Sequence, residues 1–324
     1  MNQNPTAATP ALVRPPSVAS VTVTVPGSTS NFGAGFDTLG MAVSVANRVT
    51  VSRLETSEAS EGGGIFAERE SDARAQKMVA KVAARFFEEC GRERFSFSYR
   101  IEGEVPRSRG LGSSVTVRAG IVAALNQLSG AGLSRDQLVR LVSELEGHPD
   151  NAAAGILGGF CVARSDPQTG HYVDTIRAAV PESLVFVTAA PLFEVSTQAS
   201  RGVLPQTLPY FDAVRSINSA GYLIAAMLTG DYERLRGAVS DFMHEPYRLP
   251  GIPGAVETIA AGVRAGALTG WLSGSGSSVM CAAYREDGPR VLAAMRESFE
   301  RLGQSCEAVI LNADNEGLRI NAGA

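Results

Sequence analysis

Residues 106–128 read PRSRGLGSSVTVRAGIVAALNQL, a glycine-rich loop that runs directly into an apolar segment. Glycines let the backbone turn sharply and approach a ligand closely. Gly112–Leu128 is apolar nearly all round, which predicts a buried helix. The start of such a helix exposes unpaired N–H groups and the positive end of its dipole. The stretch therefore indicates a phosphate site, with an ordinary glycine-rich strand-to-helix loop as the alternative.

Patterns on both sides of this loop predict a mixture of strands and helices. Alternating apolar residues indicate strands, helical spacing indicates amphipathic helices, and Ser134–Gln137 forms a capping-box pattern. Up to residue 147 the expected elements are strands at 19–25 and 95–101, an apolar run at 41–51, a turn-rich stretch at 26–40, and helices at 75–90, 112–128 and 134–147. Beyond residue 170 they are strands at 184–188, 278–284 and 308–312, and helices at 211–228, 232–243, 254–265 and 289–302. This order predicts an α+β fold of two domains that divide near residues 165–175.

Composition argues against several classes of function. The 324 residues carry a formal net charge of −4, unlike a protein that binds nucleic acid by neutralising phosphates. No stretch approaches 18 uninterrupted apolar residues, so we expect no membrane-spanning helix. The scattered Cys90, Cys161, Cys281 and Cys306 include no C-x-x-C pair, which indicates buried thiols in a reducing cytoplasm. Three histidines argue against a multi-histidine metal centre.

Two common nucleotide signatures fail. The Walker pattern needs a lysine beside its glycine loop, but the only lysines are Lys77 and Lys81 on a predicted helix. The Rossmann pattern is broken at Gly274–Val279 and at Gly33–Thr38. A P-loop enzyme and a dinucleotide dehydrogenase are therefore poor interpretations.

Three motifs in order match a known family. They read PGSTSNFGAGFDTLG at 26–40, GLGSS at 110–114 and LSGSGSS at 272–278. The arrangement resembles the GHMP small-molecule kinases, and within them the homoserine kinases. Further matches to that branch are EGHPDN at 146–151, Ser196–Arg201, EPYR at 245–248 and DNEG at 314–317. The resemblance covers about residues 18 to 320.

The resemblance implies a two-domain GHMP kinase fold, with an N-terminal ribosomal-protein-S5-like domain and a C-terminal ferredoxin-like domain. It implies a disordered tail at 1–17, a nucleotide-binding domain at 18–170 and a C-terminal domain at 171–324. The implied activity is ATP-dependent phosphorylation of the L-homoserine hydroxyl to O-phospho-L-homoserine, in threonine biosynthesis, with Mg²⁺ as cofactor. The implied protein is cytoplasmic, with homodimerisation possible and no nucleic-acid or membrane partner.

The resemblance also assigns residues to the nucleotide. The loop that would wrap the phosphates comprises Pro106, Arg107, Ser108, Arg109, Gly110, Leu111, Gly112, Ser113 and Ser114. Gly274 and Gly276 of the third motif would shape the pocket wall beside it. Ser114 and Glu146 would hold the metal, because magnesium prefers oxygen ligands and takes few from the protein.

The substrate side implied by the resemblance comprises Asn31, Asp37, His148, Asn151, Arg201 and Arg248. Homoserine is a zwitterion, so its site needs an acid for the ammonium and guanidinium groups for the carboxylate. Asp37 suits the first, and Arg201 and Arg248 suit the second.

The catalytic residues expected on this basis are Asn151, Asp150 and Arg201. Related mevalonate and galactose kinases use an aspartate base, whereas Asn151 resembles the residue that stands in its place here. We therefore expect direct attack of the substrate hydroxyl on the γ-phosphate, with Asp150 as the fallback base. The third motif departs from the usual S-G-A-G-P-T at Ser275, Ser277 and Ser278. A kinase for another small alcohol, or a silent nucleotide-binding and metabolite-binding relative, stays an alternative.

Overall fold

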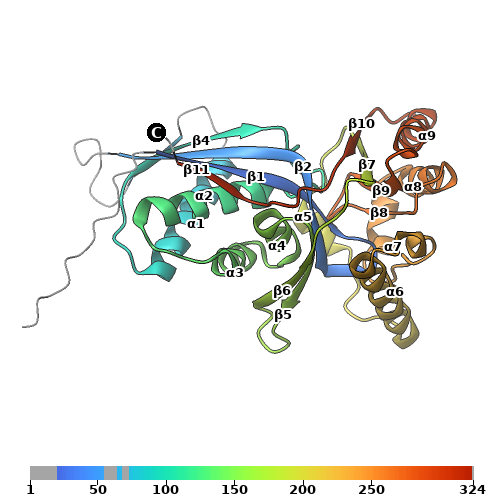
Figure 1. The fold of residues 1–324 in the computed structure, drawn as a ribbon, viewed down its shortest axis with the longest axis horizontal. Helices are drawn as coiled ribbons and strands as arrows, with labels where there is room; N and C mark the ends of the chain where they lie inside the picture. Colours follow the sequence, from blue (N-terminus) through green and yellow to red (C-terminus); the bar gives the residue numbers. More distant parts are fainter. Residues whose placement is uncertain (1–19, 55–63, 68–72, 323–324) are drawn as a thin grey trace, which may run out of the picture.

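The computed structural model describes residues 20–54, 64–67 and 73–322, so the expected tail at 1–17 lies outside the described residues. The chain forms two β-sheets, each with its own helices, at opposite ends of an elongated molecule (Figure 1). The first half contains β1 (Ser20–Asn31), β2 (Gly35–Arg53), β3 (Ile65–Ala67), α1 (Ala73–Cys90), β4 (Phe97–Gly103), α2 (Ser113–Ser129), α3 (Arg135–Glu146), α4 (Asp150–Leu157), β5 (Phe160–Ser165) and β6 (Tyr172–Ala178). The second contains β7 (Leu184–Pro191), α5 (Thr197–Gly202), α6 (Tyr210–Thr229), α7 (Glu245–Arg248), α8 (Ala255–Arg264), β8 (Thr269–Leu272), β9 (Val279–Tyr284), α9 (Gly288–Arg301), β10 (Cys306–Leu311) and β11 (Arg319–Ala322).

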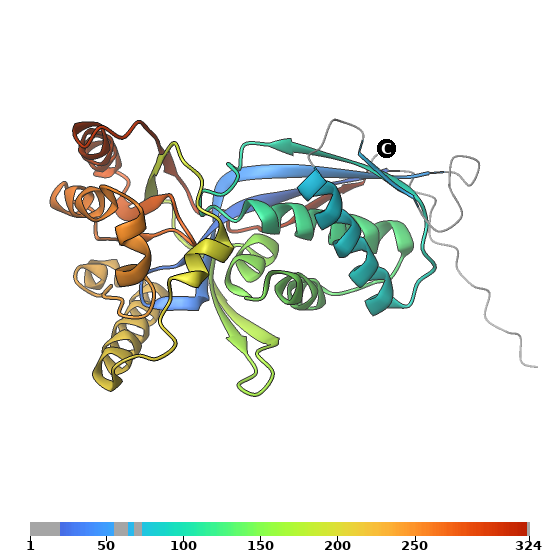
Figure 2. The same cartoon turned by 180° about the vertical axis from the view of Figure 1, so that it is seen from behind.

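The first sheet has seven strands in the order β11-β1-β2-β4-β3, and β5 joins it by pairing with β2 and β6. Helices α1 to α4 cover one face of this sheet (Figures 1 and 2). Val21, Val23 and Val25 alternate along β1 as predicted and are fully buried in the core beneath those helices. The second sheet is antiparallel in the order β10-β7-β9-β8, with α8 and α9 packed against it. The predicted α+β architecture is therefore confirmed.

The predicted domain boundary does not separate the two sheets. Strand β6 begins at Tyr172 yet pairs with β5, and β11, near the C-terminus, pairs with β1. The chain thus returns to the first sheet after completing the second. The boundary between residues 170 and 171 stays a prediction about domains.

Two local predictions were wrong. The stretch 26–40 is mostly strand, because the ladder between β1 and β2 continues from Gly27 opposite Val43 to Ser30 opposite Gly40. Its turn is confined to Phe32–Ala34. The helix expected at 232–243 is a single 3-10 turn at Tyr232–Leu235, and Gly237 then takes a left-handed φ of 74° that a continuing helix does not allow.

Helix α2 is bounded by glycines and contacts the sheet through a further glycine. Gly112 and Gly130 flank it in left-handed conformations, with φ of 67° and 61°. Inside the helix, a Cβ added to Gly120 would lie 2.5 Å from Val49 Cγ2 on β2. The absence of a side chain at residue 120 therefore sets how closely the helix approaches the sheet.

We expect Gly120→Ala to lower the free energy of unfolding by about 1–3 kcal/mol, since the added methyl overpacks the core against Val49. Gly221→Ala in α6 is the matched control, because a Cβ there meets nothing within 4 Å. Helix propensity predicts that the control is neutral or gains up to about 1 kcal/mol. Denaturant unfolding of both variants checks this, and equal effects at the two positions would contradict it.

Candidate active site

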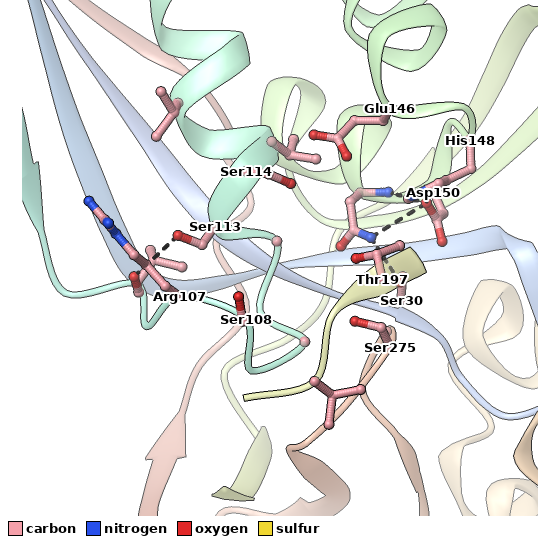
Figure 3. Close-up of a pocket in the computed structure, with 18 of the residues that line it drawn as sticks. Ser30, Arg107, Ser108, Ser113, Ser114, Glu146, His148, Asp150, Thr197 and Ser275 are labelled. Carbon is pink, nitrogen blue, oxygen red and sulfur yellow. Dashed lines mark hydrogen bonds and ion pairs between the residues drawn. The ribbon is translucent and has the colours of Figure 1, made fainter. Parts of the chain in front are cut away.

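The glycine loop brings an uncapped helix terminus to the surface of a cavity. Gly112 occupies the N-cap position of α2 and has no side chain to satisfy the first N–H groups of that helix. Ser113 and Ser114 follow in the first turn, and Figure 3 shows both beside the cavity. Free N–H groups and the positive dipole end together favour an anion at this point.

The glycine loop at 110–114 contacts both the first motif (26–40) and the third motif (272–278). A Cβ on Gly110 would lie 2.0 Å from the Ser273 carbonyl oxygen, and one on Gly112 would lie 2.3 Å from Ser28 Oγ. Ser273 Oγ donates to the Gly110 carbonyl at 2.7 Å, and Ser28 N donates to the Leu111 carbonyl at 3.1 Å. Three segments distant in the sequence therefore meet at backbone contact distance around the same loop.

A cavity of about 530 Å³ lies beside the N-terminus of α2. Most residues predicted for the site line it: Asn31, Asp37, Arg107, Ser108, Gly110, Gly112, Ser113, Ser114, Glu146, His148, Asp150, Asn151, Arg201, Arg248 and Gly274. Four predicted residues are not among its lining residues: Pro106, Arg109, Leu111 and Gly276. Arg109 forms an ion pair with Glu307 at 2.6 Å, and Leu111 is buried in the core. These two side chains support the loop from outside the cavity.

Asn151 is fixed at the start of α4 by hydrogen bonds to the first motif. Ser28 Oγ donates to Asn151 Oδ1 at 2.8 Å, and Asn151 Nδ2 donates to Ser30 Oγ at 2.9 Å. The backbone N–H of Asn151 donates to Asp150 Oδ1 at 2.7 Å. With both ends of its amide engaged, Asn151 presents one orientation to the cavity.

His148 and Asp150 form a charged pair in a nearly solvent-free position. His148 Nδ1 lies 2.5 Å from Asp150 Oδ1, and the Asp150 side chain is 2% exposed. Burial alone lowers the pKa of His148, but the Asp150 carboxylate outweighs it and raises that pKa to about 9. Burial opposes ionisation of Asp150, yet the His148 cation and the Asn151 N–H lower its pKa. At neutral pH the histidine is therefore a cation and the aspartate an anion.

Arg201, Arg248 and Asp37 form a second charged group that lines the same cavity. Arg201 Nη2 donates to Asp37 Oδ1 at 2.7 Å, so these two predicted substrate ligands pair with each other. Arg248 donates from Nε to the Ser200 carbonyl at 3.1 Å and from Nη1 to the Gly274 carbonyl at 3.3 Å. Burial and then the nearby Arg201 guanidinium lower the pKa of Arg248 to about 10. A site with this excess of positive charge attracts a carboxylate.

The donors predicted for the metal are suitable for magnesium. Glu146 and Ser114 lie near each other at the first turn of α2 (Figure 3), and both line the cavity. They offer a carboxylate and a hydroxyl, and magnesium prefers such oxygen ligands. Glu146 Oε1 also forms an ion pair with Arg118 Nη1 on α2, which the sequence patterns did not predict.

A second group of potential metal ligands comprises Asp37, His148 and Asp150, whose donor atoms lie within 4.8 Å of one another. Within this group Asp37 is already paired with Arg201, and Asp150 with protonated His148. The chain's own cations therefore compensate these acids.

Sequence patterns did not identify several residues that line the cavity. Among these are Asn47, Ala75, Met78, Ile101, Val105 and Val117. The apolar members follow ordinary core spacing on a helix or strand, so no local signal separates them from the core. Asn47 is a buried polar residue whose Nδ2 donates to Thr116 Oγ1 at 2.8 Å and whose Oδ1 accepts from Val105 N at 3.2 Å.

Comparisons with known proteins agree with this geometry. The GHMP kinase N-terminal domain model matches residues 77–159, and the GHMP kinase C-terminal model matches residues 223–301. A homoserine kinase of Moorella thermoacetica is 40% identical over 299 residues, covering 91% of this chain and 98% of that protein. A homoserine kinase of Carboxydothermus hydrogenoformans is 34% identical over 301 residues, covering 92% and 95%.

A solved structure has the same architecture. The crystal structure of homoserine kinase from Cytophaga hutchinsonii superposes with a TM-score of 0.83 at 26% identity. That match covers 96% of this chain and all of the other. Within the part of the chain that the structure describes, no helix is long and apolar enough to cross a membrane.

The His148–Asp150 pair predicts how stability depends on pH. The folded-state pKa of His148 is about 9, above its unfolded value of 6.5, so the pair's contribution is fully present below pH 6.5. It is lost as the pH rises to about 9, by on the order of 2 kcal/mol. In Asp150→Asn the Asp150 carboxylate, which does most to raise the pKa of His148, is removed, while burial still lowers that pKa against the smaller effects of Asp37 and Glu146. We therefore expect that variant to lose much less stability than the wild type between pH 6.5 and about 9.

Denaturant unfolding at intervals from pH 5 to about 9.5 measures both curves, and their difference removes the contribution of groups common to the two proteins. Parallel curves for the wild type and Asp150→Asn would contradict the assignment of a charged pair.

Proposed function

This chain belongs to the homoserine kinases of the GHMP kinase family, and from that premise we propose how its cavity phosphorylates the hydroxyl of L-homoserine. The observation that carries the proposal is one cavity lined both by an uncapped helix start and by two arginines with an acid. The helix start suits a nucleotide phosphate. The charged group suits an amino-acid zwitterion.

The substrate carboxylate would bind Arg201 and Arg248, and its ammonium would bind Asp37. The ion pair between Arg201 and Asp37 supports this. Asp37 already binds a cation, as it would bind the substrate ammonium, and Arg201 already binds an anion, as it would bind the substrate carboxylate. Binding would exchange one internal pair for two pairs with the ligand. Arg248 stays anchored by its carbonyl contacts, so little ordering is required on that side.

The nucleotide would lie along the glycine loop, with its phosphates at the first turn of α2 and its base toward Met78 and Ile101. Kinases of this family use ATP with Mg²⁺. When bound, the metal neutralises charge on the phosphate oxygens. Ser114 and Glu146 would hold it, and Arg118 keeps the Glu146 carboxylate directed toward α2.

Positioning would account for most of the rate. Phosphoryl transfer passes through a loose transition state, so the attacking hydroxyl needs little prior deprotonation. Asn151, held by Ser28 and Ser30, would orient that hydroxyl toward the γ-phosphate. Asp150 is a poor general base, because its pKa is lowered and its Oδ1 already accepts from His148 and Asn151.

ADP release with Mg-ATP and a panel of L-homoserine, L-serine, shikimate, mevalonate and galactose tests this proposal. We expect turnover with L-homoserine and far less with shikimate, mevalonate and galactose, which lack the paired ammonium and carboxylate. Preference for another alcohol would refute the substrate assignment. Calorimetric binding of nucleotide and homoserine without ADP formation would indicate a silent relative.

We expect Asp150→Asn to lower kcat by less than about a thousandfold, since positioning rather than proton abstraction is lost. Asp174→Asn, an exposed acid on β6, is the matched control and should leave kcat unchanged. Steady-state kinetics across pH measures both variants. A larger fall together with loss of the acidic limb of the wild-type profile would identify Asp150 as the base.

A further inference from the structure

We propose that His244 is a positioning residue that fixes the first-motif loop and Arg248 relative to each other for binding the amino-acid substrate. This inference rests on the proposed function. His244 immediately precedes α7, lies outside the cavity lining and is completely buried. Its ring contacts both Gly33 in the first-motif loop and the Arg248 guanidinium.

The ring has one protonation state and one orientation. Burial has the largest effect on the pKa of His244 and, with the nearby Arg248 guanidinium, lowers it despite the opposing Asp241 carboxylate, so the imidazole is neutral at pH 7. Its Nε2 lies 2.7 Å from the Gly33 carbonyl oxygen, which requires the proton on Nε2. Nδ1 is then an acceptor, and it faces Arg248 Nη1 at 3.5 Å. Nε2 therefore contacts the first-motif loop, and Nδ1 contacts Arg248.

The loop that His244 contacts needs such support. Asn31, Phe32 and Asp37 have φ of 72°, 48° and 52°, a left-handed conformation that is costly for residues other than glycine. Asn31 and Asp37 tolerate that conformation better than most residues, and Asn31 Oδ1 accepts from Asp37 N at 3.1 Å. Phe32 has no such preference, so contacts from elsewhere in the fold must help to hold the loop. The hydrogen bond from His244 to Gly33 spans 211 residues and reaches the centre of this loop.

Phe36 links the same histidine to both substrate arginines. The His244 and Phe36 rings stack with centroids 5.0 Å apart and an interplanar angle of 25°. Arg248 Cζ lies 4.9 Å from the Phe36 centroid, and Arg201 Cζ lies 5.4 Å from it. A shift of the His244 ring would therefore move Phe36 and both guanidinium groups.

The position of His244 is itself fixed by hydrogen bonds between Asp241 and the backbone around the histidine. Asp241 Oδ2 accepts the backbone N–H groups of His244 at 2.8 Å and Glu245 at 2.6 Å, while its Oδ1 accepts that of Met243 at 2.9 Å. Asp241 has no exposed side-chain surface. The ring position is thus set by the backbone before any ligand arrives, as pre-organisation of a binding site requires.

Steady-state kinetics of His244→Phe and His244→Gln test the inference. Phenylalanine keeps the ring stack and loses both polar contacts, whereas glutamine places an N–H donor near the position of Nε2. We expect His244→Phe to raise the KM for L-homoserine about tenfold, the effect of one lost hydrogen bond, and to leave the KM for ATP within about twofold. His244→Gln should recover most of the loss. His171→Phe, the same change at an exposed histidine, should alter neither constant.

Three results would overturn the inference: an unchanged KM for homoserine, equal rises in both KM values, or no recovery in His244→Gln. Thermal melting and nucleotide titration show whether each variant is folded, and if His244→Phe is not, the homoserine-to-ATP split in His244→Asn decides, because asparagine is too short to keep the contact with the Gly33 carbonyl oxygen. Absence of homoserine turnover in the wild type would instead refute the proposed function.

Discussion

The site depends on the close backbone approach of three segments around Gly110 and Gly112. Neither position has room for a Cβ, because Ser273 and Ser28 occupy the space. Both glycines also adopt left-handed φ values, which other residues rarely do. This packing places the first turn of α2 beside the first and third motifs at once. The N-terminus of α2, where we propose that phosphate binds, and the proposed amino-acid site are therefore parts of one connected arrangement.

Charge is organised around that arrangement in compensating pairs. His148 with Asp150 and Arg201 with Asp37 each place opposite charges within 2.7 Å. Only the first pair is nearly buried, and because a buried charge without a partner would be strongly destabilising, that pair depends on correct placement of the elements around it. Arg248 differs, because its hydrogen-bond partners, two carbonyl oxygens and the neutral His244 ring, carry no negative charge and its pKa is lowered. It is the group in this part of the site with most to gain from an anionic ligand.

Local patterns predicted elements well where the physical cause was local. Helix α3 begins with the capping box read at Ser134, whose side chain accepts from Gln137 N. The buried helix after the glycine loop begins at Ser113, one residue from its predicted start. Predictions failed where distant contacts decided the backbone. The first motif looks like a turn by composition, yet pairing with β2 makes most of it strand.

Residue order and local conformational preference were sufficient to predict the α+β class and the glycine loop before a buried helix, and the motifs were sufficient for the family. The sequence also supplied most of the polar residues that line the cavity, whereas Ser30, Asn47, Arg74, Glu102, Glu194, Thr197 and Ser275 were not among the predicted site residues. Only the tertiary structure decided which of them meet: that Arg201 pairs with Asp37, that Arg118 contacts Glu146, and that His244 reaches Gly33. These contacts join residues 28 to 211 positions apart. Chain folding, rather than any local pattern, sets such distances.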